Sequence, residues 1–398
     1  MTWTVGDVSG SETLEDVDHI YPSHVNELRS AVSSLLFTKP YSYIIYLDGS
    51  VWKAVNGVTL ATSFSDSDFA TVVNDVLDEL TSGGRILISY IGEITVNSSI
   101  WMRYSNTILE GCGWSTVLKA KDNLNDDVII CSEDPDELDP GQINPIYSSG
   151  VRNLFIEGNG DNQSAVGSHG GTAGIWDFYG DYNMIFENIY INNTYGTGFY
   201  PDNTHHSTIR NVHCVNCKSY GIQVYSGGHN KFSSCFARSN LLSGIYLKDT
   251  YYNSLAGVEA YMNQENGIIL YQANDTYRTW NMFSNCDIRR NGKYGIRIEG
   301  AKGNSVLGCS VLDNSYSGAG VYSGIYLTDS ETGNYATENK IEGCQIGNEA
   351  TQYQKYGITE ADANQDFNII VGNSFYNNLT AAIDQKGVND EIDHNIGA

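Results

Sequence analysis

The sequence predicts an all-β solenoid, a parallel β-helix, and three features of the chain carry this prediction. From residue 174 onward, a glycine followed by a large apolar residue recurs at intervals of 23 to 33 residues. A phrase containing asparagine and cysteine precedes many of these glycines, and alternating apolar and polar residues follow them. A period near 23 that holds two or three short alternating strands corresponds to one turn of a solenoid.

The glycine phrase marks one equivalent position in successive turns. Its members are Gly174-Ile175, Gly198-Phe199, Gly221-Ile222, Gly244-Ile245, Gly267-Ile268, Gly295-Ile296, Gly324-Ile325 and Gly357-Ile358, with Ala382-Ile383 as a variant. Equivalent positions of neighbouring turns stack about 4.8 Å apart. The apolar residue after each glycine should therefore form a ladder through the core.

The asparagine and cysteine phrase predicts two further ladders. It reads Asn230 to Cys235 to Asn240, and the same order recurs around Cys286 and Cys309. Stacked cysteines would be buried thiols without chemistry, and stacked asparagines satisfy backbone groups in left-handed (αL) corners.

This repeat resembles the right-handed parallel β-helices of the pectate-lyase-like superfamily, over roughly residues 67–398. The resemblance implies a single-stranded right-handed solenoid. It says little about activity, because the fold carries lyases, hydrolases, epimerases and adhesins without enzymatic activity.

The N-terminal residues 1–62 are predicted to be an attachment region, and residues 63–398 the β-helix. We expect a helix over 24–36, on apolar residues at heptad spacing, and a β-hairpin over 41–58. Both resemble the attachment regions of phage and archaeal-virus tail proteins. Two heptads are too short for an independent coiled coil, so a homotrimer would be held mainly by the β-helix. A simple helix packed on the solenoid is the alternative.

A second amphipathic helix is predicted over residues 67–80, with Ser65 or Ser67 as its N-cap. It would cover the open end of the solenoid and protect the strand edges there.

The composition excludes several classes of protein. The formal net charge is −25 and no cluster of Lys or Arg appears, which argues against nucleic-acid binding. No apolar run approaches the ~18 residues of a membrane span. The first residues show no Sec signal peptide, so we expect either a cytoplasmic protein or export by another route, and favour a virion tail exposed to the extracellular medium.

The sequence predicts no metal and no cofactor. Cys214 and Cys217 have metal-like spacing, with His213 beside them, but a second such pair is missing. Motifs of nucleophilic hydrolases, zinc proteases, EF-hands and nucleotide-binding loops are absent. So are the Asp-Pro-His-Asp motif of alginate epimerases and the paired aspartates of polygalacturonases, and calcium carboxylates of the lyase type cannot be assigned.

A row of aromatic and charged residues is predicted on one outer face of the solenoid. Two and four residues after each repeat glycine, side chains should point outward because strands alternate with period two. The candidate substrate-binding residues in these positions are Trp176, Tyr200, Tyr225, Tyr246, Lys248, Tyr271, Arg297, Glu299 and Tyr326. A sugar-binding face, a subunit interface and plain strand propensity all remain open explanations.

The densest group of ionisable residues is the candidate catalytic site. It comprises Asp177, Asp202, Asp181, His205 and Glu157. Asp177 falls at a nominally inward place, and we expect a bulge or strand end to turn it out. Asp177 and Asp202 could then lie within the roughly 5 to 10 Å that glycosidase carboxyl pairs require. The alternative is that these residues cap turns.

Together these features predict a virion tail spike or receptor-binding protein, a homotrimer docked to the tail or baseplate by its N-terminal region. It would bind, and possibly depolymerise, host cell-surface polysaccharide. A free polysaccharide lyase or endo-glycosidase and a non-enzymatic adhesin are the alternatives, and the choice of lyase or hydrolase chemistry stays open.

Overall fold

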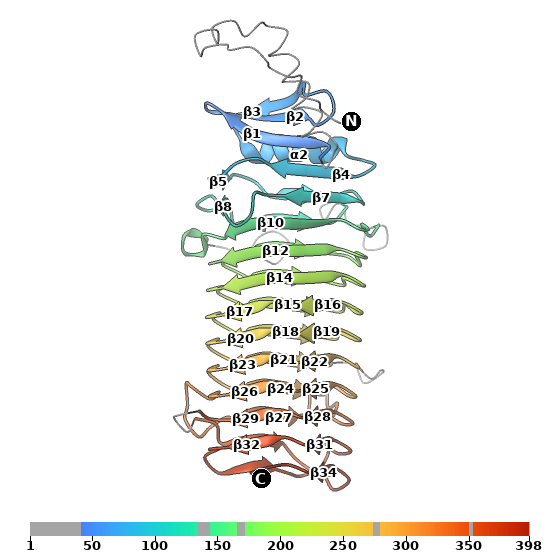
Figure 1. Cartoon of the computed structure of the whole chain (residues 1–398), viewed down its shortest axis with the longest axis vertical. Helices are drawn as coiled ribbons and strands as arrows, with labels where there is room; N and C mark the ends of the chain where they lie inside the picture. Colours follow the sequence, from blue (N-terminus) through green and yellow to red (C-terminus); the bar gives the residue numbers. More distant parts are fainter. Residues whose placement is uncertain (1–40, 134–143, 165–171, 274–278, 350–352, 398) are drawn as a thin grey trace, which may run out of the picture.

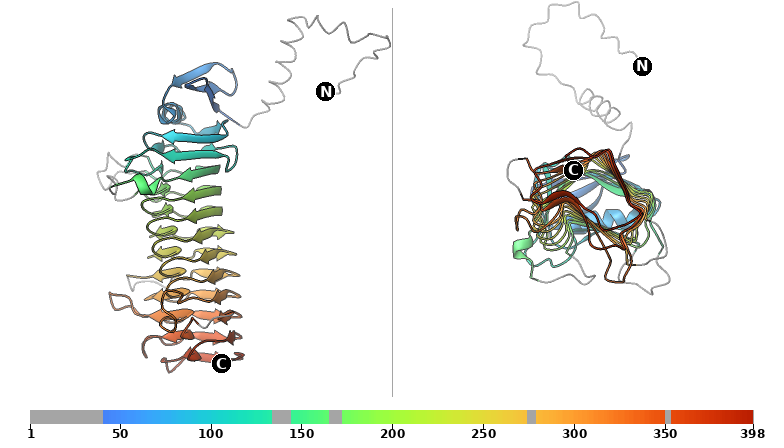
Figure 2. Two further views of the ribbon diagram at one scale, coloured as in Figure 1. Left: turned by 90° about the vertical axis from the view of Figure 1, so that its left-hand side faces the viewer. Right: turned by 90° about the horizontal axis from the view of Figure 1, so that it is seen from below.

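A computed structural model of the chain describes residues 41–133, 144–164, 172–273, 279–349 and 353–397. The chain winds into a long solenoid whose turns lie directly under one another (Figures 1 and 2). Strands of neighbouring turns pair in parallel and form two sheets, which we call sheet A, with 23 strands, and sheet B, with 11. The predicted parallel β-helix is confirmed.

Sheet B receives one strand from each turn. Its strands, in spatial order, are β6 (Ile100–Met102), β9 (Ile129–Cys131), β11 (Ile175–Asp177), β13 (Phe199–Pro201), β15 (Ile222–Tyr225), β18 (Ile245–Lys248), β21 (Ile268–Tyr271), β24 (Ile296–Glu299), β27 (Ile325–Thr328), β30 (Tyr356–Glu360) and β33 (Ala381–Asp384).

Sheet A forms the remaining walls of the solenoid. Near the N-terminal end it contains β4 (Gly84–Ile88), β5 (Gly92–Val96), β7 (Thr107–Glu110) and β8 (Thr116–Ala120), followed by the long strands β10 (Gly150–Glu157), β12 (Ile185–Asn192) and β14 (Thr208–Val215). A 3-10 turn, η2 (Gly160–Asn162), follows β10.

Beyond β14, each turn except the last contributes two short strands to sheet A. One series is β16 (Lys231–Ser233), β19 (Ser254–Ala256), β22 (Met282–Ser284), β25 (Ser305–Leu307), β28 (Lys340–Glu342), β31 (Ile369–Val371) and β34 (Glu391–Asp393). The other is β17 (Phe236–Arg238), β20 (Glu259–Tyr261), β23 (Asp287–Arg289), β26 (Ser310–Leu312), β29 (Gln345–Gly347) and β32 (Ser374–Tyr376).

The predicted apolar ladder runs through the core. Ile222 pairs with Ile245, and Ile245 with Ile268, in parallel register. All three are buried. The repeat phrase thus places one large apolar side chain per turn on the inner side of sheet B.

The asparagine ladder joins the turns at their corners. The Oδ1 of Asn253 accepts a hydrogen bond of 3.0 Å from the backbone N–H of Asn230. The Oδ1 of Asn281 likewise accepts from the backbone N–H of Asn253. The left-handed residue of each corner is the one before the asparagine, for example His229 with φ 61° and Tyr252 with φ 54°. The buried amides therefore satisfy backbone donors one turn away, as predicted.

The cysteine ladder is also present. All eight cysteines are free thiols, and all but Cys112 are buried. The thiols of Cys235, Cys286 and Cys309 lie within hydrogen-bonding reach of backbone carbonyls, at 3.4 to 3.7 Å. Their burial is consistent with a role in core packing.

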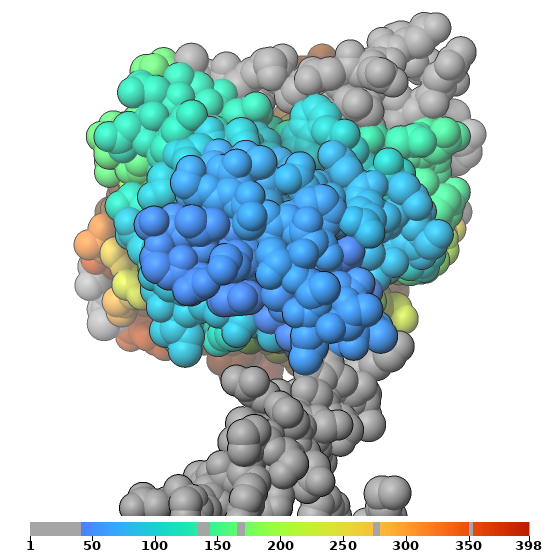
Figure 3. Space-filling view, turned by 90° about the horizontal axis from the view of Figure 1, so that it is seen from above, coloured from blue at the N-terminus to red at the C-terminus, as the bar shows by residue number. Residues whose placement is uncertain are grey.

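A helix and a three-stranded segment lie at the N-terminal end of the solenoid (Figure 1). Seen from above, the N-terminal part of the described chain covers the middle of that end (Figure 3). The helix is α2 (Phe69–Glu79), which lies within the predicted range 67–80. Its N-cap is Asp68, whose carboxylate accepts from the Ala70 N–H at 3.0 Å, so the predicted serine caps were wrong. The acidic side chain takes the cap because it immediately precedes the first helical residue.

The predicted hairpin is formed by β1 (Tyr43–Asp48) and β2 (Val51–Asn56), and β3 (Thr62–Asp66) extends it. Strand β1 also pairs in parallel with β4, so the hairpin continues the solenoid. The predicted helix over 24–36 lies outside the described residues, and the division of the chain at residue 62 stays a prediction. No helix among the described residues is long and apolar enough to span a membrane.

Candidate functional site

The outer face of sheet B carries the predicted aromatic and charged row. In β18, Tyr246 and Lys248 alternate with the buried Ile245 and Leu247, and the same alternation holds in β15 and β27. Not every outward side chain is accessible, since Trp176 is only 5% exposed. The period-two prediction therefore gives the direction of these side chains, and their neighbours decide their exposure.

Three rings of this row are stacked on a neighbouring ring, either within the row or from the adjoining turn. Trp176 and Tyr200 stack at 6.5 Å with an interplanar angle of 18°, and Tyr294 stacks on Tyr326 at 4.5 Å with 13°. A ring whose face is covered by its neighbour cannot offer that face to a ligand. The Tyr246 ring lies 4.8 Å from the Tyr220 ring, at an interplanar angle of 31°. Tyr246 and Tyr271 are not stacked on each other, because their planes are tilted by 53° at a centroid distance of 6.5 Å.

A polar pocket of about 320 Å³ opens where these two rings diverge, and we call it the sheet B pocket. Its lining residues are Tyr220, Tyr246, Lys248, Glu265, Asn266, Ile269, Tyr271, Arg297, Glu299 and Glu331. Five of the nine predicted substrate-binding residues thus converge on one concave site. Its volume falls within the range of about 300 to 1,000 Å³ that is typical of ligand sites.

Sequence reasoning missed the pocket residues that come from turns. Tyr220 directly precedes a repeat glycine, and Tyr294, outside the pocket lining, does the same three turns further on. This Tyr-Gly-Ile recurrence was a signal that could have identified them. Glu265 and Glu331 lie in turns whose lengths vary, so no fixed position in the period marks them.

Ion pairs and cation–ring contacts organise the charges of the pocket. Arg297 Nη2 lies 2.9 Å from a carboxylate oxygen of Glu299, and the Lys293 ammonium 2.6 Å from that of Glu265. The Lys248 ammonium lies over the Tyr225 ring at 5.0 Å. Burial raises the pKa of Glu299, Arg297 opposes that shift, and the nearby Glu331 adds to it.

Asp177 points into the solenoid and is completely buried, so the expected bulge that would turn it outward is absent. Its Oδ2 accepts a hydrogen bond of 2.6 Å from Thr204 in the next turn. Asp181, also buried, accepts from the Ile146 N–H at 2.8 Å. Partners from neighbouring turns explain why a carboxyl can occupy an inward position.

The two remaining oxygens of this pair, Asp177 Oδ1 and Asp181 Oδ2, receive no hydrogen bond from a neighbouring donor. The two carboxyl groups interact directly, and burial raises the pKa of Asp177 to about 6. Burial and the Asp177 charge raise the pKa of Asp181 well above its usual value. Two buried carboxyls in contact are stable only when they share a proton.

Asp202 lies outward, at the end of β13, and the Tyr200 side chain hydrogen-bonds to it. Partial burial raises the pKa of Asp202 to about 6; the Tyr200 hydrogen bond opposes this shift and the Asp177 charge adds to it. Asp202 and Asp177 are therefore neighbours on opposite sides of sheet B. A surface carboxyl that titrates near neutral pH can donate or accept a proton.

His205 and Glu157, the other two catalytic candidates, do not form one group with the Asp202 carboxyl. His205 is mostly buried in the turn after β13, with Nε2 3.0 Å from Asn203 Oδ1 and its ring 5.0 Å from that of Tyr182. Burial lowers its pKa. Glu157 ends β10 in sheet A, where it accepts from the Asn192 amide at 2.7 Å.

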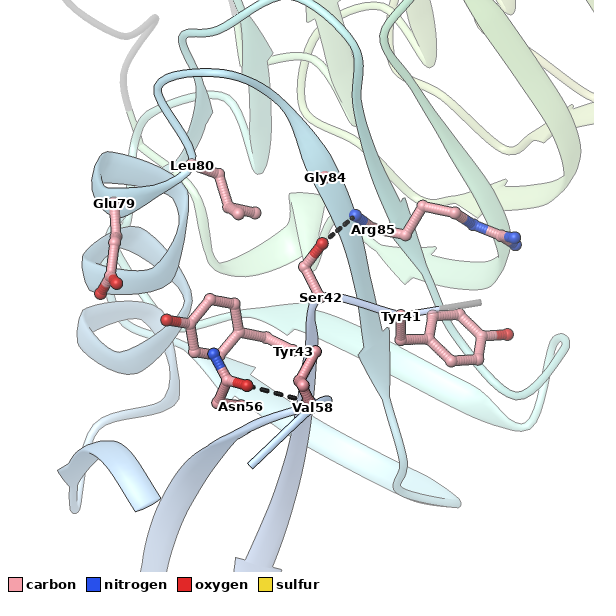
Figure 4. A pocket seen from close by; sticks show the side chains of 9 residues that line it. All are labelled: Tyr41, Ser42, Tyr43, Asn56, Val58, Glu79, Leu80, Gly84 and Arg85. Carbon is pink, nitrogen blue, oxygen red and sulfur yellow. Dashed lines mark hydrogen bonds between the residues drawn. The ribbon is translucent and has the colours of Figure 1, made fainter. Parts of the chain in front are cut away.

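A second pocket, of about 470 Å³, lies at the N-terminal cap between the hairpin, α2 and β4 (Figure 4). The polar side chains in it serve the backbone: Ser42 Oγ accepts from the Arg85 N–H and Asn56 Oδ1 from the Val58 N–H. The Arg85 guanidinium pairs with Glu110 at 2.6 Å. These contacts hold the cap together, and the sheet B pocket is the better candidate for binding.

Two family models match parts of the chain. "Right handed beta helix region" matches residues 144–279, and "Periplasmic copper-binding protein (NosD)" matches residues 236–395. The described residues contain no group of three His, Cys, Asp or Glu placed to hold a metal ion, so the copper of the second description has no fitting ligand set there. No curated protein sequence matches the chain.

The fold and these matches define the class: the chain is a right-handed parallel β-helix protein of the pectate-lyase-like fold. Among solved structures it is similar to the A-module of mannuronan C-5 epimerase AlgE6 from Azotobacter vinelandii, at 21% identity and a TM-score of 0.67, over 83% of this chain and 95% of that one.

Two further solved structures have the same fold. The enzymatically active domain of tailspike protein 2 from bacteriophage CBA120 is 12% identical with a TM-score of 0.57, over 80% of this chain and 47% of that one. A hyperthermoactive exopolygalacturonase from Thermotoga maritima is 12% identical with a TM-score of 0.56, over 80% of this chain and 85% of that one. Likeness at this level establishes the fold alone, and the neighbours are tailspikes and enzymes that act on polysaccharides.

Proposed function

We propose that this chain binds a polysaccharide along the outer face of sheet B, as the receptor-binding part of a virion tail spike. The observation that carries the proposal is the sheet B pocket, where Tyr246 and Tyr271 diverge beside Lys248 and Glu299. Aromatic rings with nearby hydrogen-bonding groups suit sugar rings, which present apolar C–H faces and polar edges. The tailspike and polysaccharide-enzyme neighbours support the same class of ligand.

The partner of the protein in this proposal is a host cell-surface glycan. Homotrimer formation and attachment to the tail or baseplate through residues 1–62 belong to the same proposal. The sheet B pocket itself lies within one chain, so glycan binding does not depend on the trimer.

Purified protein tested against a panel of polysaccharides gives the decisive experiment. Binding should weaken at least tenfold in Tyr246→Ala and Tyr271→Ala, about the 1.4 kcal/mol that one tenfold step represents. Tyr261→Ala is the matched control, because Tyr261 is also an outward strand residue with a cation over its ring, but in sheet A. Equal losses in all three variants would refute a site at the sheet B pocket.

A depolymerase is the second candidate function, and one observation favours it. Asp202, with its pKa near 6 beside the Tyr200 hydroxyl, is suited to acid–base catalysis two turns from Lys248 on the same face. In this proposal the Asp202 carboxyl donates a proton to the sugar or accepts one from it, and the Tyr200 hydroxyl orients that carboxyl. Release of reducing ends or of unsaturated products from a bound polymer would separate hydrolase from lyase chemistry.

A further inference from the structure

The charges of the sheet B pocket restrict the kind of glycan that it can hold. Three glutamates line the pocket, against only two cations, Lys248 and Arg297. Lys293 compensates Glu265 from outside the lining. The site is thus close to neutral as a whole, on a chain whose formal net charge is −25.

Both lining cations are already engaged. Arg297 is held by Glu299 at 2.9 Å, and the Lys248 ammonium lies over the Tyr225 and Tyr271 rings at 5.0 and 6.0 Å. A carboxylate, phosphate or sulfate group on the ligand would compete with Glu299 for the Arg297 guanidinium. It would gain little from Lys248 unless that side chain left both rings.

The carboxylates add a direct penalty for an anion. Glu299 is mostly buried, and Glu331 lies close enough to repel its charge. An anionic sugar would bring another negative charge into this group, where partial burial weakens screening by salt. The field of the remaining excess acidic residues acts in the same direction at longer range.

The other groups in the pocket suit hydroxyls and amides. The tilted rings of Tyr246 and Tyr271 and the apolar Ile269 line the pocket, and Tyr220 adds a further ring with a hydroxyl group. Carboxylates that are strong hydrogen-bond acceptors bind hydroxyl groups without a charge on the ligand. Apolar, donor and acceptor groups are all present, and an uncompensated cation is what the pocket lacks.

We infer that the sheet B pocket takes an uncharged segment of polysaccharide, built of hexose or N-acetylhexosamine units, and rejects polymers that carry carboxylate, phosphate or sulfate. This inference rests on the proposed function, because it names the substrate class of the same site.

The test compares a neutral panel of dextran, galactomannan and chitin oligosaccharides with an acidic panel of alginate, polygalacturonate and hyaluronate, by affinity electrophoresis and calorimetry. Measurements at about 20 and about 300 mM NaCl vary the screening length several-fold. We expect a neutral glycan to bind with less than about a twofold change between the two salts, because no ion pair forms. Acidic polymers should not bind at either salt.

The double variant Glu265→Gln/Glu331→Gln sharpens the test. It removes two carboxylates and releases Lys293, so acidic polymers should now bind at low salt. Neutral glycans should bind more weakly than to the wild type, because two carboxylate acceptors are lost. Glu342→Gln is the matched control, since it releases Lys340 in sheet A instead.

Acidic polymers that bind the wild type at low salt, and lose affinity at least about tenfold with salt or in Lys248→Gln, would overturn the inference. The proposed function would survive that outcome if Tyr246→Ala also abolished the binding. Absence of Tyr246-dependent binding in both panels would overturn the proposed function and this inference together.

Discussion

Carboxyl groups lie on both the inner and the outer side of sheet B, but their surroundings differ. On the inner side, Asp177 and Asp181 are closed off from solvent and their partners come from neighbouring turns. On the outer side, Asp202 and Glu299 have a hydrogen-bonding or charged partner and remain next to open space. Carboxyls inside the solenoid are therefore closed to a ligand, whereas those outside lie beside the candidate binding face.

The largest expected effect is on the outer side. If the protein cleaves its glycan, Asp202→Asn should lower kcat by a factor of roughly 10² to 10⁴, the usual contribution of a general acid or base. Binding should be retained, because the amide keeps the shape of the side chain. Cleavage rates and affinity measured side by side provide the check.

Glu157→Gln is the control for that variant, because it removes a carboxylate in sheet A. Full cleavage by the Asp202 variant would exclude this carboxyl and leave the protein a binder or move its catalytic site. A pH profile of the wild type with an inflection near 6 would link the activity to Asp202.

The second prediction concerns the buried pair Asp177 and Asp181, and it is measured as stability instead of activity. The folded-state pKa of Asp177 is raised from 3.8 to about 6, so the folded protein holds protons that the unfolded chain releases. Stability contributed by the protonated pair is complete below about pH 4 and is lost as the pH rises through about 6. The total should be on the order of a few kcal/mol, measured as the unfolding midpoint against pH.

Asp181→Asn isolates the pair from other groups with raised pKa, such as Asp127 at about 7. The amide gives Asp177 a permanent donor, so the variant should lose less stability than the wild type between about pH 4 and 7. Parallel pH curves for the two proteins would show that the pair does not share a proton.

The sequence could predict the features of this contrast that are set within one strand, but not those that depend on contacts between turns. The repeat phrase identified the core position of Ile245 and the outward direction of Tyr246, because alternation within a strand is local. The alternation also placed Asp177 inward, and our expectation of a bulge was wrong. Its partner Thr204 belongs to the next turn and Asp181 to the following corner, a juxtaposition that only the folded chain creates.

The pocket was predictable in part for the same reason. Residues at fixed positions after the glycine, such as Lys248 and Arg297, were identified, whereas Glu265 and Glu331 were not. Turns vary in length, so the period does not specify where their side chains end up. The stacking of Trp176 on Tyr200, which covers ring faces, likewise depends on side-chain rotation that a sequence pattern does not determine.

The third prediction distinguishes a glycan site from a subunit interface on the outer side. Light scattering of the wild type should give a trimer, and Tyr246→Ala should remain one, with a free energy of unfolding within about 0.5 kcal/mol of the wild type. Dissociation of the Tyr246 variant to monomers would favour the interface explanation, because interface aromatics are common binding hot spots. A wild-type monomer of 43.8 kDa would contradict the trimeric tail spike.

The smallest expected effect concerns the thiol ladder on the inner side. Cys235 is 1% exposed, and Cys235→Ala should lower stability by about 1 kcal/mol, since it leaves a cavity of one heavy atom. Cys235→Val is the matched control, because Val258 occupies the equivalent place in the next turn, directly before Glu259, which pairs with Phe236. Glycan binding should be the same in both variants, because neither side chain reaches the outer face. Thermal unfolding with and without a chelator completes the test: a chelator that lowered the midpoint of the wild type would mean that the thiols hold a metal, and the ladder would then be more than packing.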